Sequence, residues 1–267
     1  MILRRLGNKK KMAKKIQSYF PPHKIYIEPF FGAGGMFFNK PKVKYNFLND
    51  LDSDVFNLFS VLINNKEELI EYISLMPEDQ NLFNYWKDNK EVQPTKKALR
   101  FLMLSNFSWN GLGGNFRIGN KTDKKSLEKN LLLTYDFIIN STFSTKFLNF
   151  DFRLLLKNIS FVQDGRNDEL DVFTYSDPPY LSTSNNYNME SKWAEKDVSE
   201  CMDMTFNSGF KGAMSEFDNE FVINEAKKRG LNVIVIGERK NLKNRRAEIL
   251  ITNYKNNPSL FDGLGCL

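Results

Sequence analysis

Apolar and polar residues follow two different spacings along this chain. Short runs rich in β-branched and aromatic residues are typical of strands. They predict strands near residues 24–30, 43–48, 158–163, 170–176, 210–214, 231–236 and 248–253. From about residue 51 to 150, apolar residues instead recur every three or four positions, as they do in amphipathic helices. Two further helices are expected between the later strands, at 195–208 and 218–229.

Strands that alternate with helices predict an α/β fold built on a doubly wound, Rossmann-like sheet. The long helical stretch interrupts this pattern once. We therefore expect a sheet domain made of residues 1–50 and 151–267, and a mostly helical domain, residues 51–150, inserted into it. A chain of 267 residues is long enough for both.

A glycine-rich turn follows the first predicted strand. The run EPFFGAGG, residues 28–35, begins with Glu28 and includes Phe31, Gly32 and Gly34. Glycine lets the backbone approach a ligand closely at a strand-to-helix turn. The acid at the start of the run can balance the positive charge of a ligand. We therefore expect this turn to line a cofactor pocket.

Asp50 ends the next predicted strand, 18 residues after Gly32. An acid at this place accepts hydrogen bonds from the ribose hydroxyls of an adenosyl ligand. Asp164 follows a third predicted strand and is expected to receive the adenine amino group, with a plain turn before Gly165 as the alternative. These features also fit a dinucleotide-binding oxidoreductase, but Phe37 stands where the third glycine of G-x-G-x-x-G would be.

The clearest chemical signal follows the strand predicted at 170–176. It is the run Asp177, Pro178, Pro179 and Tyr180. Two prolines remove two N–H donors, so the turn offers a carboxylate and a carbonyl as acceptors, and an aromatic ring follows. This set suits a planar base with an exocyclic amino group, because accepting both amino protons favours a nitrogen that attacks a methyl sulfonium. For these four residues alone, a capped proline turn is the alternative.

The charge pattern predicts an anionic partner. The net charge is +6 and the pI about 9.1. Three clusters carry much of the positive charge: Arg4, Arg5, Lys9, Lys10, Lys11, Lys14 and Lys15; Arg117, Lys121, Lys124, Lys125 and Lys129; and Arg239, Lys240, Lys243, Arg245 and Arg246. A phosphate backbone is favoured over a membrane surface, because no strongly amphipathic basic helix stands out.

The composition argues against several other classes of protein. Two cysteines and one histidine do not suit a disulfide framework or a zinc cluster, so no metal is expected. No apolar run approaches the roughly 20 residues of a membrane span, and the first residues lack a signal-peptide core. A cytoplasmic protein without a membrane partner is therefore expected.

The order of these motifs resembles that of the Dam-type DNA adenine-N6 methyltransferases. LGNK at 6–9, EPFFGAGG at 28–35, LND at 48–50 and DPPY at 177–180 follow the family's order, and the helical stretch stands where the family carries its target-recognition domain. The resemblance implies a methyltransferase sheet, S-adenosylmethionine as cofactor, and double-stranded DNA whose target adenine is flipped out. A cognate restriction endonuclease is a further possible partner.

The resemblance also implies roles for single residues. Lys9 corresponds to a lysine of the family's cofactor pocket. Arg5 belongs to the same pocket by position, although the family usually has an aromatic residue there. Asp50 would bind the ribose, Asp177 would contact both cofactor and target amine, and Tyr180 would stack on the adenine.

The run at residues 177–180 is the predicted catalytic turn. DNA contacts are expected in a loop of the inserted domain, after the catalytic turn and in the last basic cluster. The residues are Asn110, Arg117, Lys121, Tyr187, Lys243, Arg245 and Arg246. In the same loop, the rings of Trp109 and Phe116 are either buried staples or wedges that contact bases. The loop departs from members that read GATC, so no recognition sequence is assigned.

Two other functions stay open at this point. DPPY also occurs in enzymes that methylate amines of ribosomal RNA, but the long insertion favours DNA. A non-catalytic DNA-binding protein on the same fold is the second alternative, and Asp177 argues against it. Transfer to cytosine N4 is less expected, since those enzymes usually have serine at this place.

Overall fold

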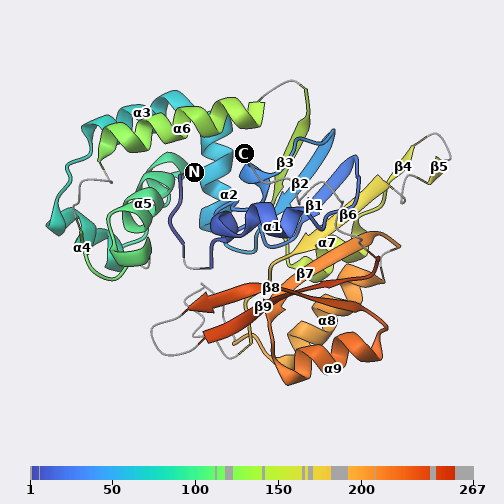
Figure 1. Ribbon diagram of the computed structural model, residues 1–267. Coiled ribbons are helices and arrows are strands. Elements are labelled where there is room, and N and C mark those ends of the chain that lie inside the picture. The colour runs from blue at the N-terminus through green and yellow to red at the C-terminus, as the bar shows by residue number, and fades with distance from the viewer. Residues whose placement is uncertain are drawn as a thin grey trace, which may run out of the picture.

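Figure 1 shows the computed structural model of the chain. The structure describes residues 2–5, 7–111, 113–117, 123–139, 142–163, 166–167, 171–181, 192–207, 209–240 and 245–255. No helix within these ranges is long and apolar enough to cross a membrane.

A seven-stranded sheet lies at the centre of the described chain, in the order β3-β2-β1-β6-β7-β9-β8. The strands are β1 (Ile25–Glu28), β2 (Tyr45–Asn49), β3 (Ser144–Leu148), β6 (Val172–Ser176), β7 (Lys211–Phe217), β8 (Asn232–Lys240) and β9 (Arg245–Thr252). All neighbours pair in parallel except β9, which is antiparallel to both β7 and β8. The strand order reverses between β1 and β6, so the sheet is doubly wound, as expected.

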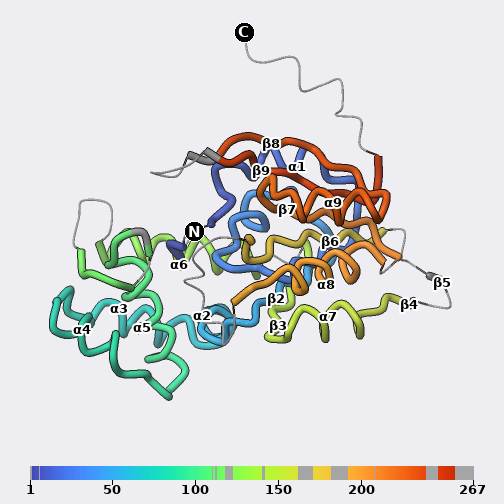
Figure 2. The backbone as a smooth tube through the Cα atoms, turned by 90° about the horizontal axis from the view of Figure 1, so that it is seen from below, coloured from blue at the N-terminus to red at the C-terminus, as the bar shows by residue number. Residues whose placement is uncertain are grey.

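Helices cover both faces of this sheet. The helices outside the central stretch are α1 (Ala13–Gln17), α7 (Phe152–Asn158), α8 (Glu195–Phe206) and α9 (Glu220–Lys228), with short 3-10 turns η1 (Lys9–Lys11) and η2 (Phe37–Asn39). Along β1, Tyr26 packs in one core cluster with Ile16 of α1, whereas Ile27 packs in another with Leu155 of α7 and Val198 of α8. Figure 2 shows α7 and α8 on the side of the sheet opposite to α1. Alternate residues of a strand therefore build the two layers.

Five helices follow β2 before the chain returns to the sheet. They are α2 (Ser53–Asn64), α3 (Lys66–Leu75), α4 (Gln80–Asp88), α5 (Pro94–Asn106) and α6 (Lys124–Ile139), with the 3-10 turn η3 (Trp109–Gly111) between the last two. Asp52 caps α2 and Asp79 caps α4, while Pro94 occupies the first turn of α5. In Figure 1, α3 to α6 gather at one end of the molecule, away from α7 to α9.

The helical stretch shares its apolar core with the sheet. Phe59 of α2 stacks on Phe147 of β3, with ring centres 4.8 Å apart and the rings nearly parallel. Phe59 also meets the edge of Phe31, which follows β1. The core cluster that contains Tyr26 runs from α1 and β1 to α5 and α6. The division into domains at residues 50 and 151 stays a prediction.

Most of the predicted elements are confirmed. β1, β2, β6, β7, β8 and β9 lie within a few residues of their predicted positions, and so do α8 and α9. The strand predicted at 158–163 is wrong as a strand of the central sheet. Residues 152–158 form α7, and β4 (Val162–Gln163) pairs only with β5 (Arg166–Asn167) in a separate two-stranded sheet.

The sheet strand that the sequence pattern missed is β3. It pairs in parallel with β2 at the edge of the sheet. Its residues are Ser144, Thr145, Lys146, Phe147 and Leu148, and none of them is fully buried. Because an edge strand needs few apolar residues, its pattern is weak. Asp151 then caps α7, which overlaps the strand predicted at 158–163 only at Asn158.

His23 is the single histidine of the chain and lies in the segment before β1. Its ring packs against the rings of Tyr26 and Phe173. The Nδ1 atom lies 2.7 Å from the carbonyl of Pro21, to which it donates in the neutral form. Burial lowers the pKa of His23 from its ordinary 6.5 to about 4.

We expect the stability of the protein to fall as the pH decreases from 6.5 to 4. The unfolded chain takes up a proton on His23 near pH 6.5, whereas the folded chain resists it until about pH 4. The loss of unfolding free energy should reach about 3 kcal/mol. Urea unfolding of wild type and His23→Phe between pH 4 and 7 measures this loss. The variant has no imidazole, so its unfolding free energy should lack this part of the pH dependence. The lone imidazole proton resonance reports the pKa directly; a midpoint near 6.5 would contradict the prediction.

Candidate active site

The carboxyl ends of the parallel strands bring the predicted site residues together. The glycine turn leaves β1, Asp50 follows β2, and Asp177 follows β6. Since β1 is the neighbour of both β2 and β6, these three segments meet at one edge, where the strand order reverses. This is the place at which open α/β sheets bind ligands.

A cavity of about 600 Å³ lies at this edge. Its walls come from the N-terminal segment, the glycine turn, the ends of β2 and β3, the catalytic turn and the start of α8. Lining residues include Arg5, Lys9, Glu28, Phe31, Gly32, Asp50, Asp52, Phe150, Asp151, Asp177, Pro179 and Trp193. Segments more than 100 residues apart in the sequence thus form one wall.

The glycine turn has the conformation that its sequence predicts. Gly32 and Gly34 have φ values of 55° and 73°, which side chains rarely adopt. A Cβ atom on Gly34 would lie 2.4 Å from the ring of Phe38. A Cβ atom on Gly35 would lie 2.3 Å from Oδ1 of Asn8, so the N-terminal segment presses against the turn. Gly34 is set back from the cavity, whereas Gly32 lines it.

Asp50 organises the turn from the end of β2. Its Oδ2 accepts the N–H of Gly32 at 2.6 Å, and its Oδ1 accepts the N–H of Asp52 at 2.9 Å. Burial raises the pKa of Asp50, and the charge of Arg5 opposes that rise. Each carboxylate oxygen can accept more than one hydrogen bond, so Asp50 can still accept ribose hydroxyls.

Arg5 lines the cavity but is held by an acid that the sequence pattern did not reveal. Its Nη2 lies 2.5 Å from Oδ2 of Asp52. Its guanidinium also lies 5.8 Å from the ring centre of Phe101 in α5. Arg5 therefore connects the N-terminal segment to the caps of the helical stretch. Asp52 could have been recognised as the N-cap of α2.

The catalytic turn is held by Lys9. The Nζ atom of Lys9 lies 2.6 Å from Oδ1 of Asp177 and 4.5 Å from the ring centre of Tyr180. Lys9 is only 3% exposed. Tyr180 is also buried, and its hydroxyl donates to Oε1 of Glu248 at 3.0 Å. An ammonium, a carboxylate and an aromatic ring thus form one compact group at the cavity.

Glu28 stands at the end of β1, beside the catalytic turn. It is buried and accepts a hydrogen bond from the hydroxyl of Tyr26 at 2.9 Å. Burial raises its pKa well above the ordinary range. A cation that enters the cavity would favour the ionised form of Glu28.

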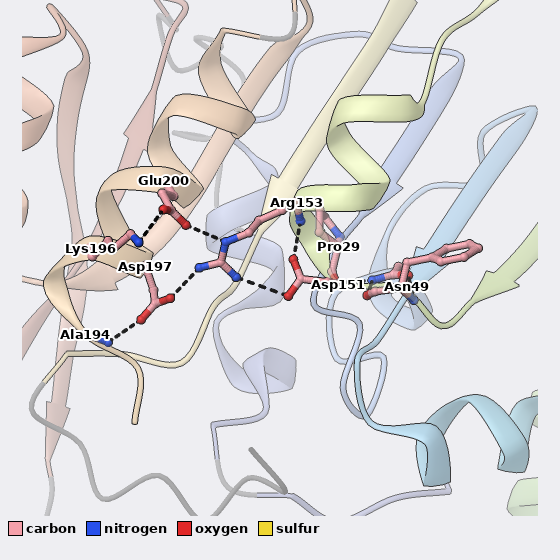
Figure 3. A network of polar contacts seen from close by, with 9 residues as sticks. Pro29, Asn49, Asp151, Arg153, Ala194, Lys196, Asp197 and Glu200 are labelled. Carbon is pink, nitrogen blue, oxygen red and sulfur yellow. Dashed lines mark hydrogen bonds and ion pairs between the residues drawn. The ribbon is translucent and has the colours of Figure 1, made fainter. Parts of the chain in front are cut away.

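The far end of the cavity is built by a network around Arg153 (Figure 3). Its guanidinium binds three carboxylates: Asp151 at 3.2 Å, Asp197 at 2.5 Å and Glu200 at 2.5 Å. Asp197 also accepts the N–H of Ala194 at 2.9 Å, which caps α8. The network therefore joins the start of α7 to the start of α8.

Aromatic rings and one amide complete this end. Trp193 meets the ring of Phe30 edge-on and packs against Phe152. Asn49 donates to the carbonyls of Pro29 and Phe150 at 3.0 and 2.9 Å, so it ties the loops after β1 and β3 together (Figure 3). These residues were not singled out as site residues from the sequence, because their positions follow from strand order.

The sequence of residues 6–228 matches the family model of the D12 class N6 adenine-specific DNA methyltransferases. The chain belongs to this family. The D12 class methyltransferase is therefore an enzyme that acts on the N6 amino group of adenine in DNA, and the resemblance to Dam-type enzymes is confirmed. The RNA-directed and non-catalytic alternatives are not favoured.

Relatives agree with this assignment. The chain is 25% identical over 286 residues to the type II methyltransferase M1.LlaDCHI of Lactococcus lactis subsp. cremoris, covering 94% of each chain. It is 32% identical over 114 residues to the DNA adenine methylase of Haemophilus influenzae, covering 40% of each. Among solved structures, the rRNA methyltransferase aviRa of Streptomyces viridochromogenes matches with a TM-score of 0.38 and 10% identity, covering 90% of this chain and 82% of that one.

The residues predicted to contact DNA are described only in part. Asp164, predicted for the cofactor, and Lys121, Tyr187 and Lys243 lie outside the described residues. The side chains of Asn110 and Arg245 do too, although the backbone of each is placed. The strand before Asp164 is not part of the central sheet, so the reason for expecting that residue beside the cofactor does not hold; Asp151, after β3, lines the cavity instead.

Of the remaining DNA candidates, Arg117 lies on the surface. Arg117 is exposed, and its guanidinium stacks 4.6 Å from the ring centre of Trp109, which is 58% exposed. Phe116 instead packs against Phe83 and Phe107. Of the two rings, Phe116 is therefore a staple that packs against other rings, whereas Trp109 is exposed and can contact a partner.

Arg246 is the described member of the last basic cluster whose side chain is placed. It is partly buried, and its guanidinium lies 5.7 Å from the ring centre of Phe217 on β7. Phe217 also packs edge-on against Tyr180. The ring of Phe217 therefore lies between Arg246 and Tyr180 of the catalytic turn. The positive charge of Arg246 thus lies near Tyr180.

Proposed function

We propose that the protein binds S-adenosylmethionine in the cavity and transfers its methyl group to N6 of an adenine flipped out of duplex DNA. The observation that carries this proposal is the meeting of the catalytic turn with the glycine turn. Asp177 lies at one end of the cavity whose wall Gly32 and Asp50 build. A donor in the cavity and an amine at the turn would therefore be close enough to react, which is the main requirement for direct transfer.

The cavity suits this cofactor in size and in chemistry. Small-molecule sites usually measure about 300 to 1,000 Å³, and the cavity has about 600 Å³. Asp50 supplies acceptors for the ribose hydroxyls, and Asp151 an acceptor for the adenine amino group. Glu28 and Asp177 supply negative charge for a cationic ligand. Trp193 and Phe30 supply an apolar wall.

S-adenosylmethionine, when bound, supplies an electrophilic methyl group. The chain itself supplies the placement of the amine. Asp177 and the carbonyl of Pro178 would accept the two protons of N6, and the nitrogen then presents its lone pair to the methyl carbon. Tyr180 would support the face of the base, with roughly 1–3 kcal/mol from stacking. As the new C–N bond forms, the bond between sulfur and the methyl carbon would break and leave S-adenosylhomocysteine, and Asp177 would be placed to take the proton that N6 must lose.

DNA would lie across the surface that carries Trp109, Arg117 and Arg246. Flipping costs a few kcal/mol, and an exposed ring stiffened by a guanidinium can support the opened duplex. We propose that residues 51–150 read the target site, because this exposed pair lies between α5 and α6. Asn110, Lys121, Tyr187, Lys243 and Arg245 remain proposed DNA contacts.

A cognate restriction endonuclease is a further proposed partner. Two relatives support it by name: the type II methyltransferase of Lactococcus lactis subsp. cremoris and the modification methylase StsI of Streptococcus sanguinis, which is 25% identical to the chain over 293 residues. This chain covers 42% of the latter protein. Methylation would then protect the sites that the endonuclease cuts.

Incubation with S-adenosylmethionine and either duplex DNA or structured RNA tests the proposed function. The nucleic acids are digested to nucleosides and measured by mass spectrometry. We expect N6-methyladenine from DNA made by amplification, which contains no methylated sites, and none from RNA. Product from RNA alone would contradict the proposed substrate, and N4-methylcytosine would contradict the proposed target atom.

A further inference from the structure

Glu248 is a buried acid beside the catalytic turn with no role in the proposed transfer. It lies on β9, opposite Phe217 of β7, and its side chain is not exposed at all. A carboxylate in such a place costs several kcal/mol unless it is paired well. The register between β8 and β9 also shifts between Val235 and Gly237, and Gly237 pairs with Glu248. Irregularities of this kind re-aim side chains next to active sites.

The contacts of Glu248 lead to the two groups that the target adenine needs. Its Oε1 accepts the hydroxyl of Tyr180 at 3.0 Å and lies 3.3 Å from Nζ of Lys9. The same ammonium lies 2.6 Å from Asp177 and 4.5 Å from the ring centre of Tyr180. Lys9 therefore occupies both the carboxylate that should accept N6 and the ring that should support the base.

Lys9 lies 4.5 Å from the centre of the Tyr180 ring, where the proposed base would stack, and 2.6 Å from Oδ1 of Asp177. When the base enters, the ammonium has to give way, and a buried ammonium must keep a carboxylate partner. Glu248 is already within 3.3 Å of it. Two other buried acids lie near the turn and already accept hydrogen bonds: Glu216 from the N–H groups of Leu181 and Phe217, and Glu28 from the hydroxyl of Tyr26.

We propose that Glu248 is a positioning residue that receives Lys9 when the target adenine displaces it from Asp177. This rests on the proposed function of the same turn. In the free enzyme, Lys9 holds Asp177 and Tyr180 in place of the base. In the complex, the ammonium moves onto Glu248, so its charge stays paired while Asp177 turns to N6. Glu248 thus acts through Lys9 and does not touch the reacting atoms.

Single-turnover methylation of amplified DNA, at saturating S-adenosylmethionine, tests this proposal with Glu248→Gln. Glutamine keeps the size and an acceptor for Tyr180 but loses the charge. We expect the methylation rate to fall about tenfold, as for other coupled polar pairs, while the KM for S-adenosylmethionine changes less than about twofold. Tyr180→Phe is the matched control, because it removes the hydroxyl contact with Glu248 and keeps the ring, and it should lose less rate than Glu248→Gln.

A double variant separates this role from a structural one. In Lys9→Met/Glu248→Gln, Asp177 has no ammonium to release, so at saturating S-adenosylmethionine we expect it to methylate faster than Glu248→Gln alone. A structural role predicts the opposite, since two buried substitutions would add their losses. Equal rates for wild type and Glu248→Gln, a double variant no faster than the single one, or a Tyr180→Phe loss as large as that of Glu248→Gln would each overturn the proposal. If the wild type itself makes no N6-methyladenine, the proposed function fails instead.

Discussion

Asp177→Ala should lower the methylation rate about 1,000-fold or more, the effect expected when a group that acts mainly in the transition state is removed. Asp177 is the acceptor for the target amine in the proposed reaction, and alanine offers neither an acceptor nor a base. Binding of DNA should change little, because Asp177 is 18% exposed at the bottom of the site and not on the outer surface. Single-turnover assays for the rate and a gel-shift titration for DNA binding measure the two effects separately.

The Asp177→Ala variant needs a control for folding, because Asp177 pairs with the buried ammonium of Lys9. Without Asp177, its ammonium keeps Glu248 at 3.3 Å, so the variant should stay folded, and its melting temperature should confirm this. Asp171→Ala is a suitable comparison, since Asp171 forms an exposed ion pair with Lys24 just before the same strand. It should methylate at the wild-type rate. A rate for Asp177→Ala within tenfold of the wild type would remove Asp177 from the mechanism.

Asp50→Ala should weaken the binding of S-adenosylmethionine on the order of 100-fold, because charged hydrogen bonds contribute about 1.5–3 kcal/mol each. The substitution removes the proposed ribose acceptor. It also removes the partner of the Gly32 N–H, which lies 2.6 Å from Oδ2. The glycine turn would then lose the contact that gives it its shape. Isothermal titration calorimetry with S-adenosylmethionine measures the change directly.

Asp50→Asn distinguishes the two contributions. Asparagine keeps one acceptor for a backbone N–H but has no charge, so its loss of affinity should lie between those of wild type and alanine. Asp79→Ala provides a control, since Asp79 also accepts two backbone N–H groups, but at the start of α4. It should lower the melting temperature without changing the affinity. Unchanged binding in Asp50→Ala would show that the ribose is held elsewhere.

The local sequence was sufficient to predict features that depend on a few adjacent residues. The tight turn after β1 was predictable from its glycines, because glycine readily adopts the left-handed φ values that Gly32 and Gly34 have. The run from Asp177 to Tyr180 carried its chemistry in its residue types. Strand patterns at β1 and β6 then placed both turns at the same edge, because parallel strands end together.

The pattern failed where a strand is short and polar. β3 lies within the stretch that was predicted to be helical, and a sheet strand was predicted at 158–163 instead, so the acid that receives the adenine amino group was expected at Asp164. Asp151 lines the cavity there instead. An edge strand pairs with a neighbour on one side only, so fewer of its side chains are buried. The alternation of apolar and polar residues that marks a strand is then weak.

The sequence by itself determined the class of fold, the resemblance to the family, the glycine turn and the positive net charge, and it predicts the catalytic role of residues 177–180. The tertiary structure alone decided which charges meet. Lys9 is 168 residues from Asp177 and 239 from Glu248 in the chain, yet its ammonium contacts both. Arg153 likewise gathers acids from α7 and α8. Such pairings depend on strand order and burial, because a buried charge must find its partner across the fold, and no local spacing records which partner that is.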